Sequence, residues 1–240
     1  MKKLIKKIFQ KFGIDIRRHN SENVWALQIQ TILKKFNINL IFDIGANNGQ
    51  YAQELFDIGY DNKIISFEPL TKAYEKLLIN SDKHDNWIIH DRCALGESQK
   101  NIEINISENS VSSSLLDILD EHVDSAKSSR YIGNELTKVD KLDNVFSLYY
   151  DNHNCALKID TQGFEKQVLK GSLKSLDKIS LIQCEISLFE LYKGGPLLDE
   201  IKSFLEELDF SLWALYPAFV SKIDGKTLQI DAIFVKNNLK

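Results

Sequence analysis

Downstream of Asn39, short runs of apolar and β-branched residues alternate with segments whose apolar residues recur at helical spacing. The strand-like runs cover residues 40–44, 64–67, 87–90, 156–159 and 179–186, and helical patterns such as 51–58 and 73–79 separate them. Strand followed by helix, repeated along a chain, is typical of parallel strands joined by crossover helices. The pattern therefore predicts an α/β fold.

The C-terminal part of the chain follows a different pattern. Pro196 opens a helix whose apolar residues Leu198, Ile201, Leu205 and Leu208 share one face. The runs "FSLWALYP" and "TLQIDAIFV" are strand-like, and the short turn region "SKIDG" joins them. They predict an antiparallel hairpin that closes the sheet. Between residues 102 and 145 a serine-rich segment, "SENSVSSSLLD", interrupts the alternation.

The first 18 residues predict a basic amphipathic helix. At about 100° per residue its apolar side chains occupy an arc of roughly 140°, lysines fill the rest, and Gly13 ends the helix. The apolar positions are Leu4, Ile5, Ile8, Phe9 and Phe12. Two interpretations stay open: an edge helix docked on the domain with solvated lysines, or an anchor for anionic lipid or a glycolipid complex. We assign residues 1–38 to an N-terminal helical extension and residues 39–240 to a single domain.

Composition adds an uneven distribution of charge to this picture. The chain has 240 residues, of which 43% are hydrophobic and 27% charged, as is typical of a soluble globular protein with one α/β core. Its net charge is −4. Residues 1–18 hold seven basic residues against Asp15 alone, a charge of +6, so the rest of the chain carries −10.

The three cysteines bear on where the protein is found. Cys93, Cys155 and Cys184 lie in apolar runs without CxxC spacing, which favours buried thiols in a reducing compartment over disulfides or zinc. No apolar run approaches the roughly 18–20 residues that span a bilayer, and lysines interrupt the N-terminus too often for a signal peptide. We expect a cytoplasmic protein, with peripheral contact at the inner face of the membrane through residues 1–18 as the open alternative.

A glycine-containing turn follows the first strand-like run. It reads "FDIGANNGQY", with Asp43 at the strand end and Gly45 and Gly49 in the turn. Glycines let the backbone bend sharply and let a ligand lie against it. The dinucleotide fingerprint GxGxxG is absent because Asn47 replaces its second glycine, and Asp43 would repel phosphate while suiting an ammonium or sulfonium group. A purely structural tight turn remains the alternative.

The second strand-like run ends in "SFEP", with Glu68 nineteen residues after Gly49. In doubly wound folds a carboxylate at this place accepts hydrogen bonds from ribose hydroxyls. The turn and Glu68 together therefore predict a site for a nucleoside that carries positive charge and no phosphate. S-adenosylmethionine meets both requirements.

Several segments in order resemble the FkbM-type S-adenosylmethionine-dependent methyltransferases. They are "FDIGANNGQY", "SFEP", "CALGE", "SVSSSL", "TKVDKLD", "LKIDTQGFEKQVLKGS" and "QCEIS". The resemblance covers residues from about 40 to about 190 and implies a Rossmann-like class I methyltransferase fold, with a mostly parallel seven-stranded sheet ending in an antiparallel hairpin. It also implies O-methylation of hydroxyls on sugars, glycan chains or polyketides. We therefore expect a role in glycan biosynthesis, acting on a sugar or glycan acceptor that is either free or lipid-linked.

The catalytic residues that the resemblance implies are acidic. Asp160 ends the strand-like run beside the first one, and Glu165 and Glu185 are the other candidates for a general base or a divalent-metal site. Glu165 also suits the first turn of a helix, and Glu185 also suits a salt bridge at the sheet edge. Gln162 departs from the family pattern, in which many relatives carry an acidic residue.

The same resemblance, together with the glycine-containing turn and Glu68, implies a set of cofactor-binding residues. They are Asp43, Gly45, Ala46, Asn47, Gly49, Glu68, Pro69, Asp91, Arg92, Cys93, Ser114 and Asp160. Asp91 could hold the adenine amine, although a surface Asp–Arg pair explains it almost as well. The serine run that contains Ser114 could bond cofactor or acceptor, or belong to a plain loop.

Three other functions compete with this prediction. A nicotinamide oxidoreductase would need the missing glycine, and a nucleic-acid methyltransferase would need a broad basic surface. The main alternative is a non-catalytic partner in glycan assembly that binds S-adenosylmethionine. The histidines show no ligand spacing, so a divalent metal held by the acidic residues stays possible but unsupported.

Overall fold

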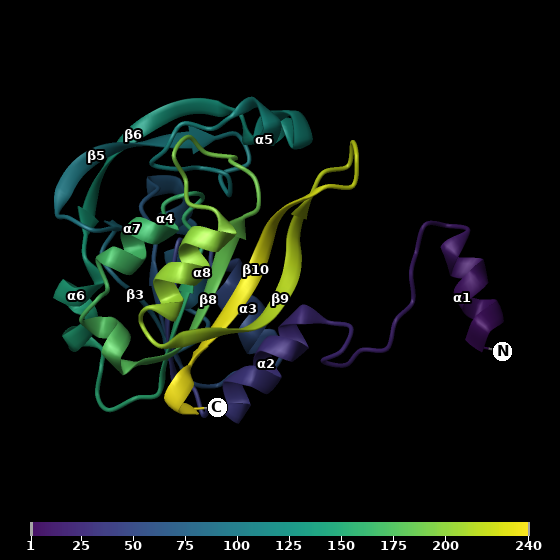
Figure 1. Cartoon of the computed structure of the whole chain (residues 1–240), viewed down its shortest axis with the longest axis horizontal. Coiled ribbons are helices and arrows are strands. Elements are labelled where there is room, and N and C mark those ends of the chain that lie inside the picture. The colour runs from purple at the N-terminus through teal and green to yellow at the C-terminus, as the bar shows by residue number, and fades with distance from the viewer. Residues whose placement is uncertain (1, 240) are drawn as a thin grey trace.

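A computed structural model describes the backbone of residues 2–239 and the side chains of residues 5–239, so the expected place of Leu4 on an apolar helix face lies outside the described side chains. The chain folds around a seven-stranded sheet (Figure 1). Its strands, in spatial order, are β3 (Trp87–Ile89), β2 (Lys63–Phe67), β1 (Leu40–Ile44), β7 (Cys155–Ile159), β8 (Ile179–Ser187), β10 (Thr227–Lys236) and β9 (Phe210–Val220). The first five are parallel, β10 runs antiparallel to β8, and β9 runs antiparallel to β10. The predicted sheet and its closing hairpin are confirmed.

Helices cover both faces of the sheet. On one side, α2 (Trp25–Lys35), α3 (Gln50–Asp57) and α4 (Thr71–Ser81) pack on residues such as Ile41 and Ile64. On the other side, α6 (Leu142–Val145), α7 (Glu165–Lys170) and α8 (Leu198–Glu206) pack on Leu40 and Phe42. Successive strand residues point to opposite faces, so a continuous apolar run such as 40–44 fits a strand that is buried on both sides. All three cysteines are buried and free.

A second, three-stranded sheet lies in the segment where the sequence pattern was interrupted. Its order is β4 (Ala94–Leu95), β6 (Tyr131–Asp140) and β5 (Lys100–Ser107), and α5 (Asp120–Ser125) lies in the loop between β5 and β6. Short 3₁₀ helices complete the described elements, at Lys127–Ser129, Phe146–Leu148, Ser175–Lys178 and Asn237–Leu239. The sequence analysis missed this sheet because β5 and the first half of β6 are largely exposed and polar.

The N-terminal helix α1 (Lys2–Gln10) forms as predicted but lies apart from the domain (Figure 1). Ile8 and Phe12 are 48% and 77% exposed, so the interpretation as a docked edge helix is wrong in this structure. Helix α2, which we had grouped with the extension, instead buries Ile29, Ile32 and Leu33 in the core. In the part of the chain that the structure describes, no helix is both long enough and apolar enough to cross a membrane.

Candidate active site

A cavity of about 320 Å³ lies at the carboxyl ends of the central parallel strands. The cavity is lined by the turn after β1, the end of β2, the segment after β7 and Trp25 of α2. Its size falls at the lower end of the range for small-molecule sites, roughly 300–1,000 Å³. Ligands in open α/β sheets bind at this edge. The strand ends picked out from the sequence thus meet at one cavity.

The two glycines of the first turn are explained by the chain's own atoms. Gly45 has φ +78°, and a Cβ there would lie 1.8 Å from the carbonyl oxygen of Asp160. Gly49 has φ +86°, and its Cβ would lie 2.3 Å from the ring of Trp87. Gly45 borders the cavity, whereas Gly49 is not among the described residues that line it. Close packing of the protein therefore requires both glycines, and only Gly45 also lies where a ligand could contact it.

Glu68 lines the cavity at the end of β2 and is held by the backbone. The N–H of Asn47 donates to its Oε2 at 2.7 Å, and the N–H of Leu70 donates to its Oε1 at 2.8 Å. Asn47 itself has φ +49°, a left-handed conformation that asparagine tolerates better than most residues. Burial raises the pKa of Glu68 to about 7, although these N–H donors favour its charged form. Each carboxylate oxygen retains a second lone pair for a ribose hydroxyl, so Glu68 fits its predicted role.

Asp43 does not play the electrostatic role that the sequence suggested. It is fully buried on β1 and is not among the described residues that line the cavity. Lys158 is its register partner on β7, and the two form an ion pair with Nζ and Oδ1 3.2 Å apart. Ser66, its register partner on β2, donates from Oγ to Oδ2 at 3.1 Å. The charge of Asp43 is therefore compensated inside the protein.

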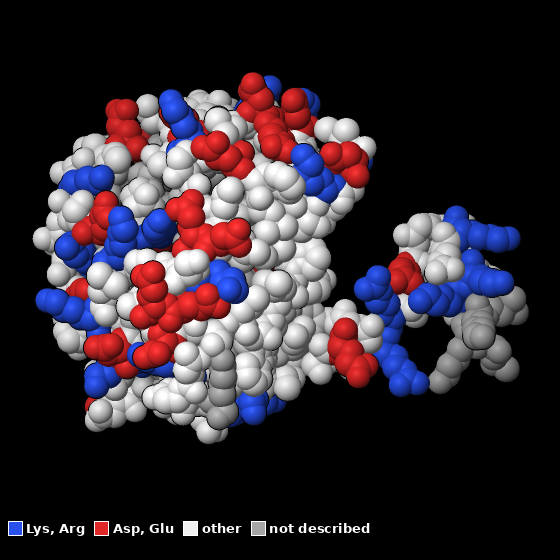
Figure 2. Space-filling model, viewed as in Figure 1, with Lys and Arg blue, Asp and Glu red and all other residues white. Residues whose placement is uncertain are grey.

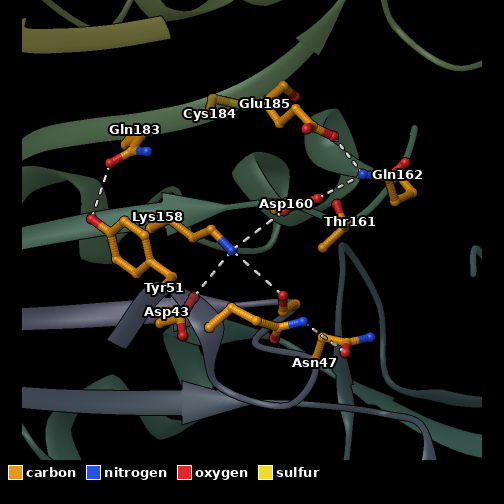
Figure 3. A network of polar contacts seen from close by, with 12 residues as sticks. Asp43, Asn47, Tyr51, Lys158, Asp160, Thr161, Gln162, Gln183, Cys184 and Glu185 are labelled. Atoms are coloured by element: carbon orange, nitrogen blue, oxygen red, sulfur yellow. Dashed lines mark hydrogen bonds and ion pairs between the residues drawn. The ribbon is translucent and has the colours of Figure 1, made fainter. Parts of the chain in front are cut away.

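Lys158 is a site residue that the sequence analysis missed. Burial opposes its charge, but the carboxylates of Asp43 and Asp160 raise its pKa above the ordinary value. Its Nζ lies 3.6 Å from Oδ2 of Asp160, so it connects the buried Asp43 to a carboxylate of the cavity (Figure 3). A lysine inside the apolar run "ALKID" was the available signal, because buried lysines are almost always paired.

The segment after β7 brings Asp160 and Glu185 together through Gln162 (Figure 3). The side-chain amide of Gln162 donates from Nε2 to Asp160 Oδ1 at 2.8 Å and to Glu185 Oε2. Tyr192 donates from its hydroxyl to Gln162 Oε1 at 2.7 Å, which orients the amide. Gln229 also donates to Glu185, at 2.9 Å. Gln162, noted in the sequence only as a departure, is thus the hydrogen-bonding centre of this cluster.

Glu165, the third acidic candidate, has a different position. It is not among the described residues that line the cavity. Its Oε1 accepts hydrogen bonds from the N–H of Thr161, the hydroxyl of Thr161 and the N–H of Gly163, at 3.0–3.2 Å. Burial raises its pKa to about 7, although these N–H donors favour the charged form. The structure therefore gives Glu165 the role of stabilising the turn that carries Asp160 and Gln162.

The residues after β3 divide into two groups. Asp91 is exposed, and neither Asp91 nor Arg92 is among the described residues that line the cavity. Arg92 instead donates to the carbonyl oxygen of Pro69 at 2.5 Å and pairs with Glu135 at 3.4 Å. The expected contact of Asp91 and Arg92 with a cofactor is not supported, because neither residue lines the cavity.

The remaining predicted residues do border the cavity: Ala46, Pro69, Cys93 and Ser114. Ser114 comes from the serine-rich loop, and its hydroxyl donates to the backbone carbonyl of Gln162 at 2.7 Å. This bond joins the loop to the Asp160 turn. Among the described residues, no cluster of three or more histidine, cysteine, aspartate or glutamate side chains is arranged to hold a metal ion.

Acidic residues predominate in the cavity. Among the described residues that line it, five carry carboxyl groups, Glu54, Glu68, Asp160, Glu185 and Asp231, and one, Lys158, carries an ammonium group. Burial and the charge of Asp160 raise the pKa of Glu185 well above its ordinary value and the pKa of Asp231 to about 6. The site thus favours neutral or cationic ligands over anionic ones.

Sheet order, cavity position and a buried carboxylate at the end of β2 define a nucleoside-binding α/β domain of the doubly wound class. The family described as "Methyltransferase FkbM domain" matches residues 43–212, and the chain belongs to this family. The methyl donor of this family is S-adenosylmethionine, so the chain is an S-adenosylmethionine-dependent methyltransferase by family. In the comparison with curated proteins, no sequence matches the chain.

Three solved structures similar to the chain are distant from it in sequence. A proposed methyltransferase from Streptococcus mutans, in complex with S-adenosylhomocysteine, is 13% identical; the match covers 87% of this chain and 97% of that one, with a TM-score of 0.47. An rRNA methylase from Streptococcus thermophilus is 13% identical over 87% and 95% of the two chains, with a TM-score of 0.45. A proposed tRNA methyltransferase from Streptococcus pneumoniae, in complex with S-adenosyl-L-methionine, is 10% identical over 86% and 72%, with a TM-score of 0.46. At these TM-scores they do not bear on the acceptor of this chain.

Proposed function

We propose that the protein transfers the methyl group of S-adenosylmethionine to a hydroxyl of an uncharged acceptor, with a sugar or glycan as the acceptor class. The observation that carries the proposal is the arrangement of carboxylates in one cavity. Glu68 lies at the end of β2, and the Asp160–Gln162–Glu185 cluster lies where β7 and β8 end. The end that contains Glu68 suits the binding of a ribose. The end that contains the Asp160–Gln162–Glu185 cluster suits the removal of a proton from the acceptor hydroxyl.

The cofactor end uses Glu68 and the first turn. Glu68 accepts hydrogen bonds from ribose hydroxyls, while Gly45, Ala46 and Asn47 supply the adjoining backbone wall. Bound S-adenosylmethionine supplies an electrophilic methyl group. The protein contributes mainly by positioning the two reactants, which can account for roughly 7–11 kcal/mol of a barrier.

The acceptor end contains aromatic and acidic side chains. Trp25 stacks on Tyr216 with ring centroids 5.1 Å apart, and Tyr51 donates to Gln183 at 3.0 Å beside Lys158. Aromatic faces together with carboxylate and amide groups suit a ring that carries hydroxyls. The five carboxylates in the lining disfavour a polyanionic acceptor such as RNA.

Asp160 is the residue best placed to receive the acceptor proton. Its side chain is 34% exposed, it lies in the cavity lining, and its Oδ2 lies 3.6 Å from Nζ of Lys158. Gln162 holds its other oxygen. Glu185 is the weaker candidate, because burial and the neighbouring Asp160 raise its pKa well above the ordinary value and so disfavour its charged form.

Mass spectrometry of cell-surface glycans tests this proposal. Cells that express the wild-type chain should carry a sugar heavier by one methyl substitution than cells that express Asp160→Asn. Methyl transfer to nucleic acid or protein, with unchanged glycans, would overturn the assignment of the acceptor.

The non-catalytic alternative requires a separate assay. Purified protein is incubated with S-adenosylmethionine and a glycan extract, and S-adenosylhomocysteine is measured. Glycan-dependent release of S-adenosylhomocysteine supports catalysis. Binding of S-adenosylmethionine without any release would favour a partner role in glycan assembly.

A further inference from the structure

The N-terminal helix α1 exposes an apolar face although the domain beside it is fully folded. Within α1, Ile5 is 45% exposed, Ile8 48% and Phe9 40%, and the exposed apolar residues continue after the helix with Phe12 at 77%, Ile14 and Ile16. Figure 1 shows the helix held away from the sheet on an extended connection. Apolar side chains gathered on one face of a helix indicate a surface that a partner covers.

The same segment is basic. Lys6, Lys7 and Lys11 flank the apolar face, and Arg17 and Arg18 follow it, whereas Asp15 is the only acidic residue before Arg18 (Figure 2). Asp15 is already paired, with Lys6 at 3.2 Å and with Arg17 at 2.7 Å. The partner must therefore be apolar in its interior and negatively charged at its surface.

The connection sets how this segment relates to the active site. Residues 19–24 join this segment to α2, which begins at Trp25 at the cavity, and they contain no helix or strand. Six residues can span at most roughly 20–22 Å. A partner bound by residues 5–18 therefore lies within about this distance of Trp25, and it does not need to touch the domain.

We propose that residues 5–18 bind the surface of an anionic lipid bilayer, with the apolar face of α1 among the acyl chains and the basic residues at the headgroups. A bilayer with anionic headgroups offers both properties in one partner, and interfacial helices of this composition lie in the membrane plane. The rest of the chain carries −10, so an acidic bilayer repels the domain and attracts only the segment. The binding is peripheral and reversible.

Flotation of the full-length protein with vesicles tests the proposal. We expect the protein to float with phosphatidylcholine vesicles that contain phosphatidylserine and to remain at the bottom with pure phosphatidylcholine. Salt should weaken the binding. Lys7→Gln and Lys11→Gln should each lower partitioning by roughly fivefold, which corresponds to about 1 kcal/mol for each basic residue near the surface.

Matched variants test whether flotation depends on the N-terminal segment or on exposed residues elsewhere. Phe12→Ser should abolish flotation, whereas Ile132→Ser, on an exposed β6 residue that is 63% accessible, should leave it unchanged. Lys72→Gln and Lys76→Gln on the exposed face of α4 are the controls for charge.

Three outcomes would overturn the proposal. The first is wild-type protein that does not float with anionic vesicles, and the second is flotation that Phe12→Ser does not alter. The third is concentration-dependent self-association, seen by sedimentation and lost in Phe12→Ser, without flotation; this result would make a second copy of the chain the partner of α1. Methyl transfer does not enter the test, so its result is independent of the proposed function.

Discussion

At the scale of single residues, the proposed chemistry depends most on Asp160. Asp160→Asn keeps the shape of the side chain and removes its charge. We expect kcat to fall by roughly 10²- to 10⁴-fold, the usual contribution of one proton-transfer group, while the Kd for S-adenosylmethionine changes little. Steady-state kinetics at saturating cofactor and calorimetry measure the two effects separately.

The control for Asp160 is Asp91→Asn, which changes an exposed carboxylate outside the cavity lining and should leave both constants unchanged. Normal turnover by Asp160→Asn would remove Asp160 from the mechanism. Loss of cofactor affinity with normal kcat at saturation would make Asp160 a cofactor ligand, and Glu185 would then be the remaining acidic residue of the cluster.

Glu68 leads to a prediction about pH. Its pKa in the folded protein is raised to about 7, and only its charged form accepts two ribose hydrogen bonds. Binding of S-adenosylmethionine should therefore strengthen as the pH rises through this pKa, from about 6 to about 8. Glu68→Gln should remove this dependence. Glu68→Ala should weaken binding by about 1.5–3 kcal/mol, roughly 10- to 150-fold, which calorimetry measures.

Folding stability should respond to pH in the opposite direction. A carboxyl group whose pKa is raised on folding stabilises the protein fully below its unfolded pKa, and this contribution is lost as the pH rises through the folded value near 7.

An affinity for S-adenosylmethionine that did not change with pH, or that was unchanged in Glu68→Ala, would refute the ribose assignment.

The sequence predicted part of the site for physical reasons that individual residues illustrate. Glu68 and Asp160 were found because parallel strands end at one edge, which makes a polar residue after an apolar run conspicuous. Asp43 was misjudged because its charge partner, Lys158, is 115 residues away along the chain and adjacent only in the folded sheet. The hydrogen-bonding role of Gln162 was missed for the same reason, since Gln162 follows β7 and its partner Glu185 lies on β8.

At the scale of secondary-structure elements, β1 and β7 share a buried ion pair as well as their backbone pairing. Asp43 and Lys158 face each other in register and are almost inaccessible to solvent. Lys158→Met would leave the carboxylate of Asp43 buried without its cation, and we expect a loss of about 3–5 kcal/mol in the free energy of unfolding. Urea denaturation measures this loss.

The double variant Asp43→Asn/Lys158→Met is the matched control for this pair. It removes both charges, so it should recover much of the stability that the single variant loses. A change within about 0.5 kcal/mol for Lys158→Met alone would show that the pair contributes little to folding.

Helices and strands could be predicted from the sequence where their residues are mostly buried. Six strands of the main sheet were found within one residue of their ends, because buried strands give continuous apolar runs. The exposed strand β9 continues three residues beyond its predicted run, from Pro217 to Val220. The β4–β6–β5 sheet gave no such signal, since β6 exposes most of the residues between Ile132 and Lys138. The existence of α1 followed from its periodicity, but its separation from the domain did not, because an apolar face does not identify what covers it.

Because α1 lies apart from the cavity, its removal should have a selective effect. Deleting residues 1–18 should leave the Kd for S-adenosylmethionine nearly unchanged, since the cavity is lined from Trp25 onward. Calorimetry of the truncated and full-length proteins measures this. A tenfold loss of affinity would mean that the segment acts as a lid over the cofactor.

At the scale of the whole molecule, charge and geometry act together. An acidic domain, charged −10 outside residues 1–18, is joined to a segment charged +6 by residues 19–24, which span roughly 20–22 Å at most. If the segment binds an acidic bilayer while the domain is repelled, the cavity is kept close to the surface and is not pressed onto it. This arrangement suits an acceptor sugar that a lipid carries at the membrane.

The last prediction follows from this arrangement and from both proposals. With a lipid-linked glycan in anionic vesicles, the full-length protein should show a lower apparent KM than the protein lacking residues 1–18, because the bilayer confines enzyme and acceptor to one surface and raises their effective concentration. With the water-soluble sugar alone, the two proteins should share the same KM. Their kcat values should agree in both assays, since deleting the segment leaves the cavity intact. Equal KM values on the vesicle-bound glycan would contradict a role of membrane binding in acceptor capture, even if flotation shows that α1 binds lipid.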